Sequence, residues 1–431
     1  MQFGGKVDVS DAFAEKLYKI DGLIDRVVGL SGAAADKEAR KTDGSKRVTV
    51  VVPKLDDAEW AGTARSDQCT LILTEGDSAK ASAVAGLSVV GRQKYGVFPL
   101  RGKVMNVCDV SADKVAANSE ISAIKKILGL QTGRTYASAA ELRYGRVMLM
   151  TDADTDGSHI KGLVMNLFLQ QWPSLMRVEG FLCTLLTPIV KVWPGGDPAA
   201  KGNKDRRRKA VAASAASKKA KGVSASSSPG VSALGEAAPS DVLEFYNLGD
   251  FERWKEGRIA TGAQSQQQPY SKYYKGLGTS TAEEARDWFK RMRMVVYTWE
   301  EADGRSCEAL GKAFDKKRAD DRKAWLQAYD SNRTLDYGLG DVSFTDFVER
   351  DLVHFSNYDV LRSIPSAVDG LKVSQRKALY GCRKRNLVKG EVRVAQLSAY
   401  VSEHACFHHG EASMQVTFSL RGAPPLRGAH P

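Results

Sequence analysis

The sequence predicts an α/β fold in which a mostly parallel sheet is covered by helices and is followed by a mainly helical region. Between residues 69 and 193, short apolar runs alternate with helical patterns, and such alternation is typical of parallel strands joined by crossover helices. From about residue 343 to residue 420, apolar residues recur with helical spacing and basic clusters lie among them. With 431 residues, the chain is long enough for two or three domains of ordinary size.

Six elements are expected in order within the first region. Strands are expected over Cys69–Thr74, Tyr95–Leu100 and Gly145–Met150, and helices over Ser78–Leu87, Ser119–Leu130 and Ser158–Trp172. Each expected strand is a short apolar run, which is the length typical of a buried strand. Ser119 is a residue type that often caps a helix at its N-terminus.

The expected elements continue farther along the chain. VLEFYNL, from Val242, predicts another strand, and the strongly charged stretch 281–330 predicts helices. KGLGTS, from Lys275, is Gly-rich but lacks the full phosphate-binding P-loop pattern. We interpret it as a loop in which Ser280 or Thr281 caps the following helix.

Composition excludes several classes of protein. Hydrophobic residues make up 43% and charged residues 26% of the chain, as in soluble globular proteins. There is no apolar run of about 18 residues, so no membrane span is expected, and the N-terminus lacks a secretory signal pattern. The six scattered cysteines form no CxxC motif, which argues for a reducing compartment and against a disulfide framework. The formal charge of +12 suggests a polyanionic partner.

The segment 195–241 is rich in Ala, Ser, Gly, Lys and Arg and has almost no large apolar residues. Such a segment cannot bury enough apolar surface to offset its ordering entropy, so we expect a disordered basic insertion. Its cluster Arg206–Lys209 is either a nuclear import signal or DNA-tethering arm, or a part of a solvated insertion. Both interpretations stay open.

Two acidic motifs follow apolar strands. Glu75 and Asp77 come directly after the first expected strand, and Asp152, Asp154 and Asp156 come directly after the third. Chemistry in open α/β sheets collects at the carboxyl ends of strands, and in an extended segment alternate residues point to one side. Mg²⁺ prefers oxygen ligands, so we expect one or two Mg²⁺ ions here, which suits phosphodiester chemistry.

Two alternatives compete with a magnesium site. Either motif alone is also typical of a solvated acidic turn, in which Asp156 and Gly157 supply the turn and Ser158 caps a helix. DADTDG is similar to the start of a calcium-binding EF-hand loop, but Leu163 stands where that loop needs a bidentate Glu. The calcium loop is therefore excluded.

Several long motifs resemble one known family. EGDSAKASAVAGL, YGVFPLRGKVMNV and MTDADTDGSHIKGL resemble the Toprim domain of eukaryotic-type DNA topoisomerase II, a type IIA topoisomerase. KYYKGLGTSTAEEARDWF resembles the segment after the Toprim core. RSIPSAVDGLKVSQRKALYGC and VRVAQLSAYVSEHACFHHGEAS resemble the start of the DNA-cleavage domain. The resemblance covers about residues 50–420, apart from the basic insertion.

The resemblance implies an organisation and a function. It implies a remnant of the connecting transducer region over 1–50, a Toprim domain over 51–330, a partial winged-helix DNA-cleavage domain over 331–420 and an unrelated tail over 421–431. The family passes one DNA duplex through a transient enzyme-linked break in another. Members use Mg²⁺, use ATP in the full-length protein, work on double-stranded DNA as homodimers and lie in the nucleus.

The resemblance also implies roles for residues near the acidic motifs. The Mg²⁺ ligands would be Glu75, Asp152 and Asp154, with Asp156 the least certain, and Glu75 would also take part in catalysis. In the PLRGK motif, Arg101 and Lys103 would hold DNA near the metal, which fits a phosphate-binding role. An alternative for Lys103 is a salt bridge with the acidic cluster.

The resemblance also implies four basic residues that would bind DNA: Arg362, Lys372, Arg376 and Lys377. They surround a helix expected to begin near Val373, whose N-terminus can also bind phosphate; the alternative is a solvated basic helix face. The family usually has Pro-Gly where this chain has Val373 and Ser374, which is expected to alter the turn.

The histidines of FHHGE are the last catalytic candidates. The second of them, His409, would lie beside the scissile phosphate and aid catalysis. A zinc site formed by His404, Cys406 and His408 is excluded, because their spacing fits no zinc signature.

The family's tyrosine nucleophile and its ATPase domain are not found in this chain. No Tyr follows Tyr400, and no phosphate-binding glycine motif stands in residues 1–50. We therefore expect the chain to be inactive alone. One alternative function is a non-enzymatic DNA-binding fragment. Another is a different Toprim phosphoryl-transfer enzyme, such as a primase or nuclease, which leaves Lys272–Ser413 unexplained.

Overall fold

The structure is a computed structural model, and it describes residues 10–11, 16, 20, 37, 39–196, 242–260, 269–274, 276–300, 304–387, 391–407 and 411–419. Several sequence predictions fall wholly or mostly outside these residues. They are the transducer remnant over 1–50 for most of its length, the basic insertion from residue 197 on, His409 and the tail 421–431.

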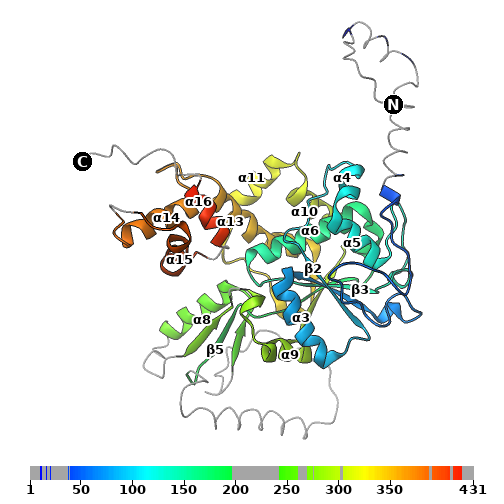
Figure 1. Cartoon of the computed structure of the whole chain (residues 1–431), viewed down its shortest axis with the longest axis horizontal. Coiled ribbons are helices and arrows are strands. Elements are labelled where there is room, and N and C mark those ends of the chain that lie inside the picture. Colours follow the sequence, from blue (N-terminus) through cyan, green and yellow to red (C-terminus); the bar gives the residue numbers. More distant parts are fainter. Residues whose placement is uncertain are drawn as a thin grey trace.

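The main sheet has six strands in the order β2-β1-β3-β4-β8-β9, and Figure 1 labels β2 and β3 of this sheet. Their bounds are β1 Thr70–Glu75, β2 Tyr95–Leu100, β3 Arg146–Met150, β4 Leu182–Leu185, β8 Met294–Thr298 and β9 Asp341–Ser343. The first four strands in that order are parallel, β8 runs antiparallel to β4, and β9 is parallel to β8. The predicted mostly parallel sheet is confirmed. In the register, Glu75 stands opposite Leu100 and Thr74 opposite Met150, so β1, β2 and β3 end at one edge.

Helices cover both faces of this sheet because alternate strand residues point to opposite sides. The helices involved are α3 Gly76–Val90, α4 Ala112–Ala117, α5 Ser119–Leu128, α6 Thr155–Gln171 and α9 Ala282–Arg291. Leu71 and Leu73 of β1 belong to the core that includes α5 and α6, whereas Ile72 belongs to the core that includes α3 and α9. At Gly86 an added Cβ would lie 2.1 Å from Phe289, so a glycine there lets α3 approach α9 closely.

Two helix starts differ from the sequence prediction. Asn118, not Ser119, caps α5, because its side chain accepts the N–H groups of Glu120 and Ile121 at 3.0 Å. The helix predicted from Ser158 begins at Thr155, with Asp154 as its cap. Both caps are polar residues placed one turn before the apolar pattern becomes visible.

The stretch 281–330 is not entirely helical as predicted. It contains α9, the strand β8, α10 Arg305–Phe314 and α11 Ala319–Gln327. In β8, Val295 and Tyr297 are buried and their neighbours are partly exposed, so the period of two indicates a strand. Thr281 caps α9 and accepts the N–H of Glu284 at 3.2 Å, as predicted.

A smaller antiparallel sheet stands beside the main one, in the order β6-β5-β7. Its strands are β5 Val190–Trp193, β6 Leu243–Phe245 and β7 Tyr270–Tyr273, and α8 Leu248–Ala260 follows β6. Phe245 packs with Phe251 and Trp254 of α8. The strand predicted in VLEFYNL is confirmed. Short turns of 3-10 helix connect the elements: η1 Ser66–Gln68, η2 Ala139–Glu141, η3 Pro173–Arg177, η5 Leu277–Thr279 and η6 Tyr337–Leu339.

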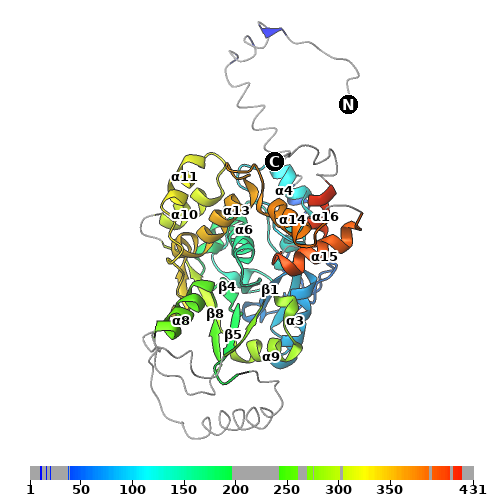
Figure 2. The ribbon, with the colours of Figure 1, turned by 90° about the vertical axis from the view of Figure 1, so that its left-hand side faces the viewer.

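The C-terminal region is mainly helical, as predicted. Its elements are α12 Phe344–Phe347, the π-helical turn η7 Val348–Leu352, α13 Val353–Ser363, α14 Val373–Lys384, α15 Val394–His404 and α16 Glu411–Ser419. Figure 2 shows α14, α15 and α16 gathered in a group of their own, with α13 beside α6. The group has a small core of its own that includes Ala378, Leu397 and Val401. None of the described helices is long and apolar enough to cross a membrane.

Candidate functional site

Glu75 is the last residue of β1 and is half-buried. Its Oε2 accepts the backbone N–H of Asp152 at 3.1 Å. Asp152 lies two residues after the end of β3, so this bond joins the carboxyl ends of two neighbouring parallel strands. The structure thus brings the two predicted acidic motifs together at one edge of the sheet.

Asp152 is held by a loop that the sequence prediction did not connect with the site. Its Oδ1 accepts the backbone N–H of Leu277 at 2.7 Å. At Gly276, an added Cβ would lie only 2.5 Å from Asp152 Oδ2. Gly276 and Leu277 of the Gly-rich run therefore contact the site, and the run also precedes the α9 cap. The glycines of this run were the one visible signal, because close backbone approach often needs glycine.

Unbalanced negative charge collects on Glu75 and Asp152. Burial, followed by the nearby charge of Asp152, raises the pKa of Glu75 to about 7. Burial also raises the pKa of Asp152 to about 6, with a further contribution from the charge of Asp154. Among the described residues, no Lys or Arg nitrogen forms an ion pair with either carboxylate. A hard divalent cation with oxygen ligands would supply the missing positive charge, so the donor set fits Mg²⁺.

The carboxylates are not drawn together around one point. Within the described part of the chain, the group of three candidate ligand residues whose ligand atoms all lie within 4.8 Å is Cys108, Asp109 and Asp315, not the predicted set. Direct binding of one cation by all three of Glu75, Asp152 and Asp154 would therefore require these carboxylates to move closer together.

The chain turns into helix within the DADTD motif, so an extended segment there is a wrong expectation. Asp154 caps α6 and its Oδ1 accepts the N–H of Gly157 at 2.9 Å. Asp156 already lies in the first turn of the helix. At Gly157 an added Cβ would lie 2.0 Å from the carbonyl oxygen of Asp152, which shows how tightly this turn folds. The three aspartates consequently do not line one side of a strand.

Asp156 is bound by two cations. Lys103 Nζ lies 2.7 Å from its Oδ1, and the two terminal nitrogens of Arg362 lie 2.8 Å from Oδ1 and Oδ2. Burial would raise the pKa of Asp156, but the hydrogen bonds from Arg362 and Lys103 outweigh burial and hold this pKa well below its ordinary value. The salt bridge that was the alternative for Lys103 is thus present, and Arg362 is paired with a carboxylate.

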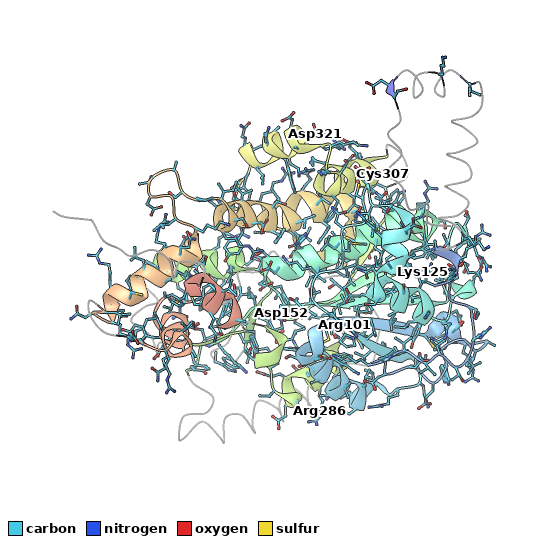
Figure 3. The ribbon with its side chains drawn as sticks, turned by 45° about the horizontal axis from the view of Figure 1, so that its top comes forward. Arg101, Lys125, Asp152, Arg286, Cys307 and Asp321 are labelled. Atoms are coloured by element: carbon cyan, nitrogen blue, oxygen red, sulfur yellow. The ribbon has the colours of Figure 1, made fainter. Side chains whose placement is uncertain are left out.

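The other basic candidates differ in where they lie. Arg101, labelled in Figure 3, follows β2 directly. Its backbone N–H donates to the Glu120 carboxylate, and the residue is exposed. Arg376 forms two hydrogen bonds with the Asp369 carboxylate, at 2.9 and 3.0 Å, and it does not line the cleft described next.

A cleft of about 600 Å³ separates the sheet edge from the C-terminal helices. Glu75, Lys103 and Asp156 line one side, and Arg362, Lys372, Val373, Ser374 and Lys377 line the other. Lys372 stands directly before α14, so the N-terminus of this helix borders the cleft. Lys377 donates to the carbonyl oxygen of Cys406 at 2.7 Å. His409 lies outside the described residues, whereas Phe407 and Ser413 line the cleft.

Family models match three successive stretches of the chain. They are the Toprim domain over residues 70–179, the C-terminal associated domain of TOPRIM over 229–360, and the A-type subunit of DNA gyrase/topoisomerase IV over 362–420. DNA topoisomerase 2 of Saccharomyces cerevisiae is 41% identical over 416 residues, which is 96% of this chain. DNA topoisomerase 2 of Arabidopsis thaliana is 42% identical over 417 residues, again 96% of this chain. The chain belongs to the DNA topoisomerase II family.

A solved structure agrees with this assignment. The crystal structure of the Plasmodium falciparum topoisomerase II DNA-binding, cleavage and re-ligation domain matches with a TM-score of 0.67 and 40% identity, and the match covers 86% of this chain and 44% of that one. The chain spans about a quarter of the length of the curated topoisomerase relatives, 26% for the yeast protein and 25% for the plant protein.

The family assignment confirms the predicted resemblance and the predicted fold class. It also accounts for the stretch from Lys272 to Ser413, which a primase or nuclease with a Toprim domain would leave unexplained. The boundary between two of the matched models falls at residue 361. Arg362, which reaches back to Asp156, is therefore the first residue of the stretch that matches the gyrase and topoisomerase IV model.

Proposed function

We propose that this chain forms the metal-binding and DNA-positioning part of a type II DNA topoisomerase. Such an enzyme uses ATP to pass one duplex through a transient, enzyme-linked double-strand break in another. The observation that carries the proposal is the cleft that Glu75, at the sheet edge, lines together with Lys372 and Lys377 at the C-terminal helices. One side is acidic and suits cations, and the other side is basic and suits phosphates.

The chemistry follows from what each side offers. Glu75, Asp152 and Asp154 would hold one or two Mg²⁺ ions, which would stabilise charge on the oxygens of a phosphodiester that is being displaced. Lys103, Lys372 and Lys377 neutralise phosphates of the DNA backbone, and the N-terminus of α14 adds backbone N–H donors. His409 is proposed to donate a hydrogen bond to a phosphoryl oxygen at the cleavage point.

Other features of the family are proposals for the protein to which this sequence belongs. They are ATP use in the full-length protein, a homodimer and a nuclear location, which the basic cluster Arg206–Lys209 also favours. Tyrosyl transfer would supply the covalent link to DNA. The expectation that the 431-residue polypeptide is inactive alone stays a prediction, so DNA binding is the property for which this polypeptide is tested.

Binding of a fluorescent DNA duplex across a salt series tests the proposal. We expect affinity to fall steeply as salt rises, because phosphate contacts release counterions. The double variant Lys372→Met, Lys377→Met should reduce the slope of log K against log salt by about two. Lys323→Met is the control, because Lys323 is exposed on α11 and does not line the cleft. An unchanged slope in the double variant would refute the proposed DNA surface.

A supercoiled plasmid with Mg²⁺ separates the alternatives. Binding without strand breaks supports the proposal for this polypeptide. Nicking with Mg²⁺ alone would instead support a Toprim nuclease, and no binding at low salt would exclude the proposed function.

A further inference from the structure

The Asp156 carboxylate stands at the centre of a three-residue cluster. Its Oδ1 accepts from Lys103 Nζ at 2.7 Å and from one Arg362 nitrogen at 2.8 Å, and its Oδ2 accepts from the other at 2.8 Å. The side chains of Asp156 and Arg362 are each 19% exposed and that of Lys103 is 37% exposed. A carboxylate has about four acceptor positions, and protein donors take three of them. One acceptor position remains, and the positive charges of Lys103 and Arg362 beside it oppose the approach of a metal ion to Asp156.

Arg362 is itself fixed, because the helical segment formed by η7 and α13 is bonded to α6 near both of its ends. At the far end, Asp351 accepts from Ser158 Oγ at 2.7 Å, from Lys161 Nζ at 3.0 Å and from Tyr337 OH at 2.8 Å. The two helices run antiparallel, since Asp156 meets Arg362 while Lys161 meets Asp351, and Figure 2 shows them side by side.

Packing between these two ends keeps the helices in register. The rings of His159 and Phe355 stack with their centroids 3.8 Å apart. An added Cβ at Gly162 would lie 2.8 Å from Phe314 of α10 and 3.3 Å from Leu352 of η7. The position of the Arg362 guanidinium relative to the metal motif is therefore set by a packed helix pair.

Lys103 has donors left for another partner. Its ammonium carries three N–H groups, and within the described part of the chain one of them is taken, by Asp156. Lys103 Nζ also lies 4.5 Å from the centre of the Phe355 ring, which limits where the side chain can point. Lys103 lines the same cleft as Glu75, so its remaining N–H groups are available on the side where a phosphate would approach the metal ligands.

We infer that Asp156 is a positioning residue: fixed by Arg362, its carboxylate holds the Lys103 ammonium toward a DNA phosphate in the cleft, and it does not bind the metal. This inference rests on the proposed DNA-binding function of the cleft. It assigns Arg362 to the support of Asp156 rather than to an open phosphate contact.

A double-mutant cycle on DNA binding tests the inference, with the 431-residue chain, a fluorescent duplex and EDTA to remove divalent cations. Lys103→Met should weaken binding roughly fivefold to tenfold near 0.1 M salt and reduce the salt slope by about one. In the Asp156→Asn background, the same Lys103→Met change should cost less than half as much on a logarithmic scale. Asp156→Glu, which keeps the charge, should restore most of the cost.

A different role of Asp156 would give the opposite result in this cycle. If Asp156 is only a metal ligand or a repelling charge, Asp156→Asn frees the lysine, and Lys103→Met then costs as much as in the wild type or more. That result overturns the inference while leaving the proposed function intact, since the wild type still binds DNA. A wild type that binds no DNA removes both proposals.

Folding of each variant is checked by circular dichroism and thermal melting. If Asp156→Asn does not fold, Arg362→Gln takes its place, because loss of the fixing guanidinium should lower the cost of Lys103→Met in the same way. An undiminished cost in the Arg362→Gln background again contradicts the inference.

Discussion

The backbone N–H of Asp152 donates to the Glu75 carboxylate at 3.1 Å, although 77 residues separate the two in the chain. The bond is made where β1 and β3 end side by side, and the Asp152 carboxylate in turn accepts the N–H of Leu277. Two acidic motifs and one Gly-rich loop are thereby joined into a single site. The geometry of this site depends on the pairing of β1 with β3 and on the position of the loop.

The close approach of Gly276 to Asp152 predicts the effect of a side chain there. The backbone at Gly276 is extended, which any residue can adopt, so only the clash at 2.5 Å from Asp152 Oδ2 opposes substitution. Gly276→Val should push Asp152 aside and weaken Mg²⁺ binding about tenfold, as measured by calorimetry.

Gly257→Ala is the matched control for this change. An added Cβ at Gly257 meets no atom of the described residues within 4 Å, and Gly257 is an exposed residue of α8. The Gly257→Ala variant should leave Mg²⁺ binding unchanged and should be more stable than the wild type by about 0.5–1 kcal/mol. Equal Mg²⁺ affinity in the two variants would show that Asp152 does not depend on the glycine loop.

Replacement of the buried Arg143 should cause a large loss of stability. Its guanidinium is fully buried and donates to the carbonyl oxygens of Arg47, Val48 and Ile127 as well as to the Asp57 carboxylate. Arg143→Met should lower the free energy of unfolding by about 3–5 kcal/mol, because it leaves a charge and several acceptors without their donor. Urea denaturation measures this change.

Arg134→Met provides the comparison for the buried arginine. Arg134 pairs with Glu141, but its side chain is 44% exposed. An exposed pair contributes about 0–1 kcal/mol, so the variant should unfold close to the wild-type urea concentration. Similar losses for the two arginine variants would contradict the assigned role of burial.

Ionisation of Glu244 should make the stability of the fold depend on pH. Burial would raise its pKa, but hydrogen bonds from Arg291 and Lys191 outweigh burial and lower the pKa from 4.5 to about 2. A lowered pKa in the folded state means that the stabilisation is complete above about pH 4.5 and is lost as the pH falls toward 2. The ionised group should contribute on the order of 3 kcal/mol.

Glu244→Gln should therefore be less stable than the wild type at pH 7, and the difference should shrink between about pH 5 and pH 2. Thermal or urea unfolding of both proteins at a series of pH values measures it. A difference that stays constant over this range would mean that ionisation of Glu244 does not stabilise the fold.

The cap of α5 can be tested with two neighbouring alanine substitutions. Asn118→Ala removes the acceptor of two backbone N–H groups and should cost about 1 kcal/mol of stability. Ser119→Ala should change stability by less than about 0.5 kcal/mol, since Ser119 is the first helical residue and not the cap. A larger loss at Ser119 would favour the cap that the sequence predicted.

Local pattern predicted the elements whose burial is simple. β2 has the predicted bounds, and the bounds of β1 and β3 differ from the predicted ones by one residue. A short apolar run between turn residues is typical of a buried strand, so these strands were recognisable. β8 was missed because MVVYT stands between charged helices, and the strands β4 and β9 that pair with its two edges come from distant parts of the chain. The start of α6 was missed because its first turn is made of polar residues that carry the site.

The sequence alone determined the family, the parallel sheet and the acidic residue types, since these depend on local motifs and on alternation along the chain. Only the tertiary structure decided which side chains meet. It joined Glu75 to Asp152, placed Gly276 against Asp152, and paired Asp156 with Lys103 and Arg362. These contacts depend on strand register and on the antiparallel packing of α13 along α6. Neither can be predicted from the spacing of residues along the chain.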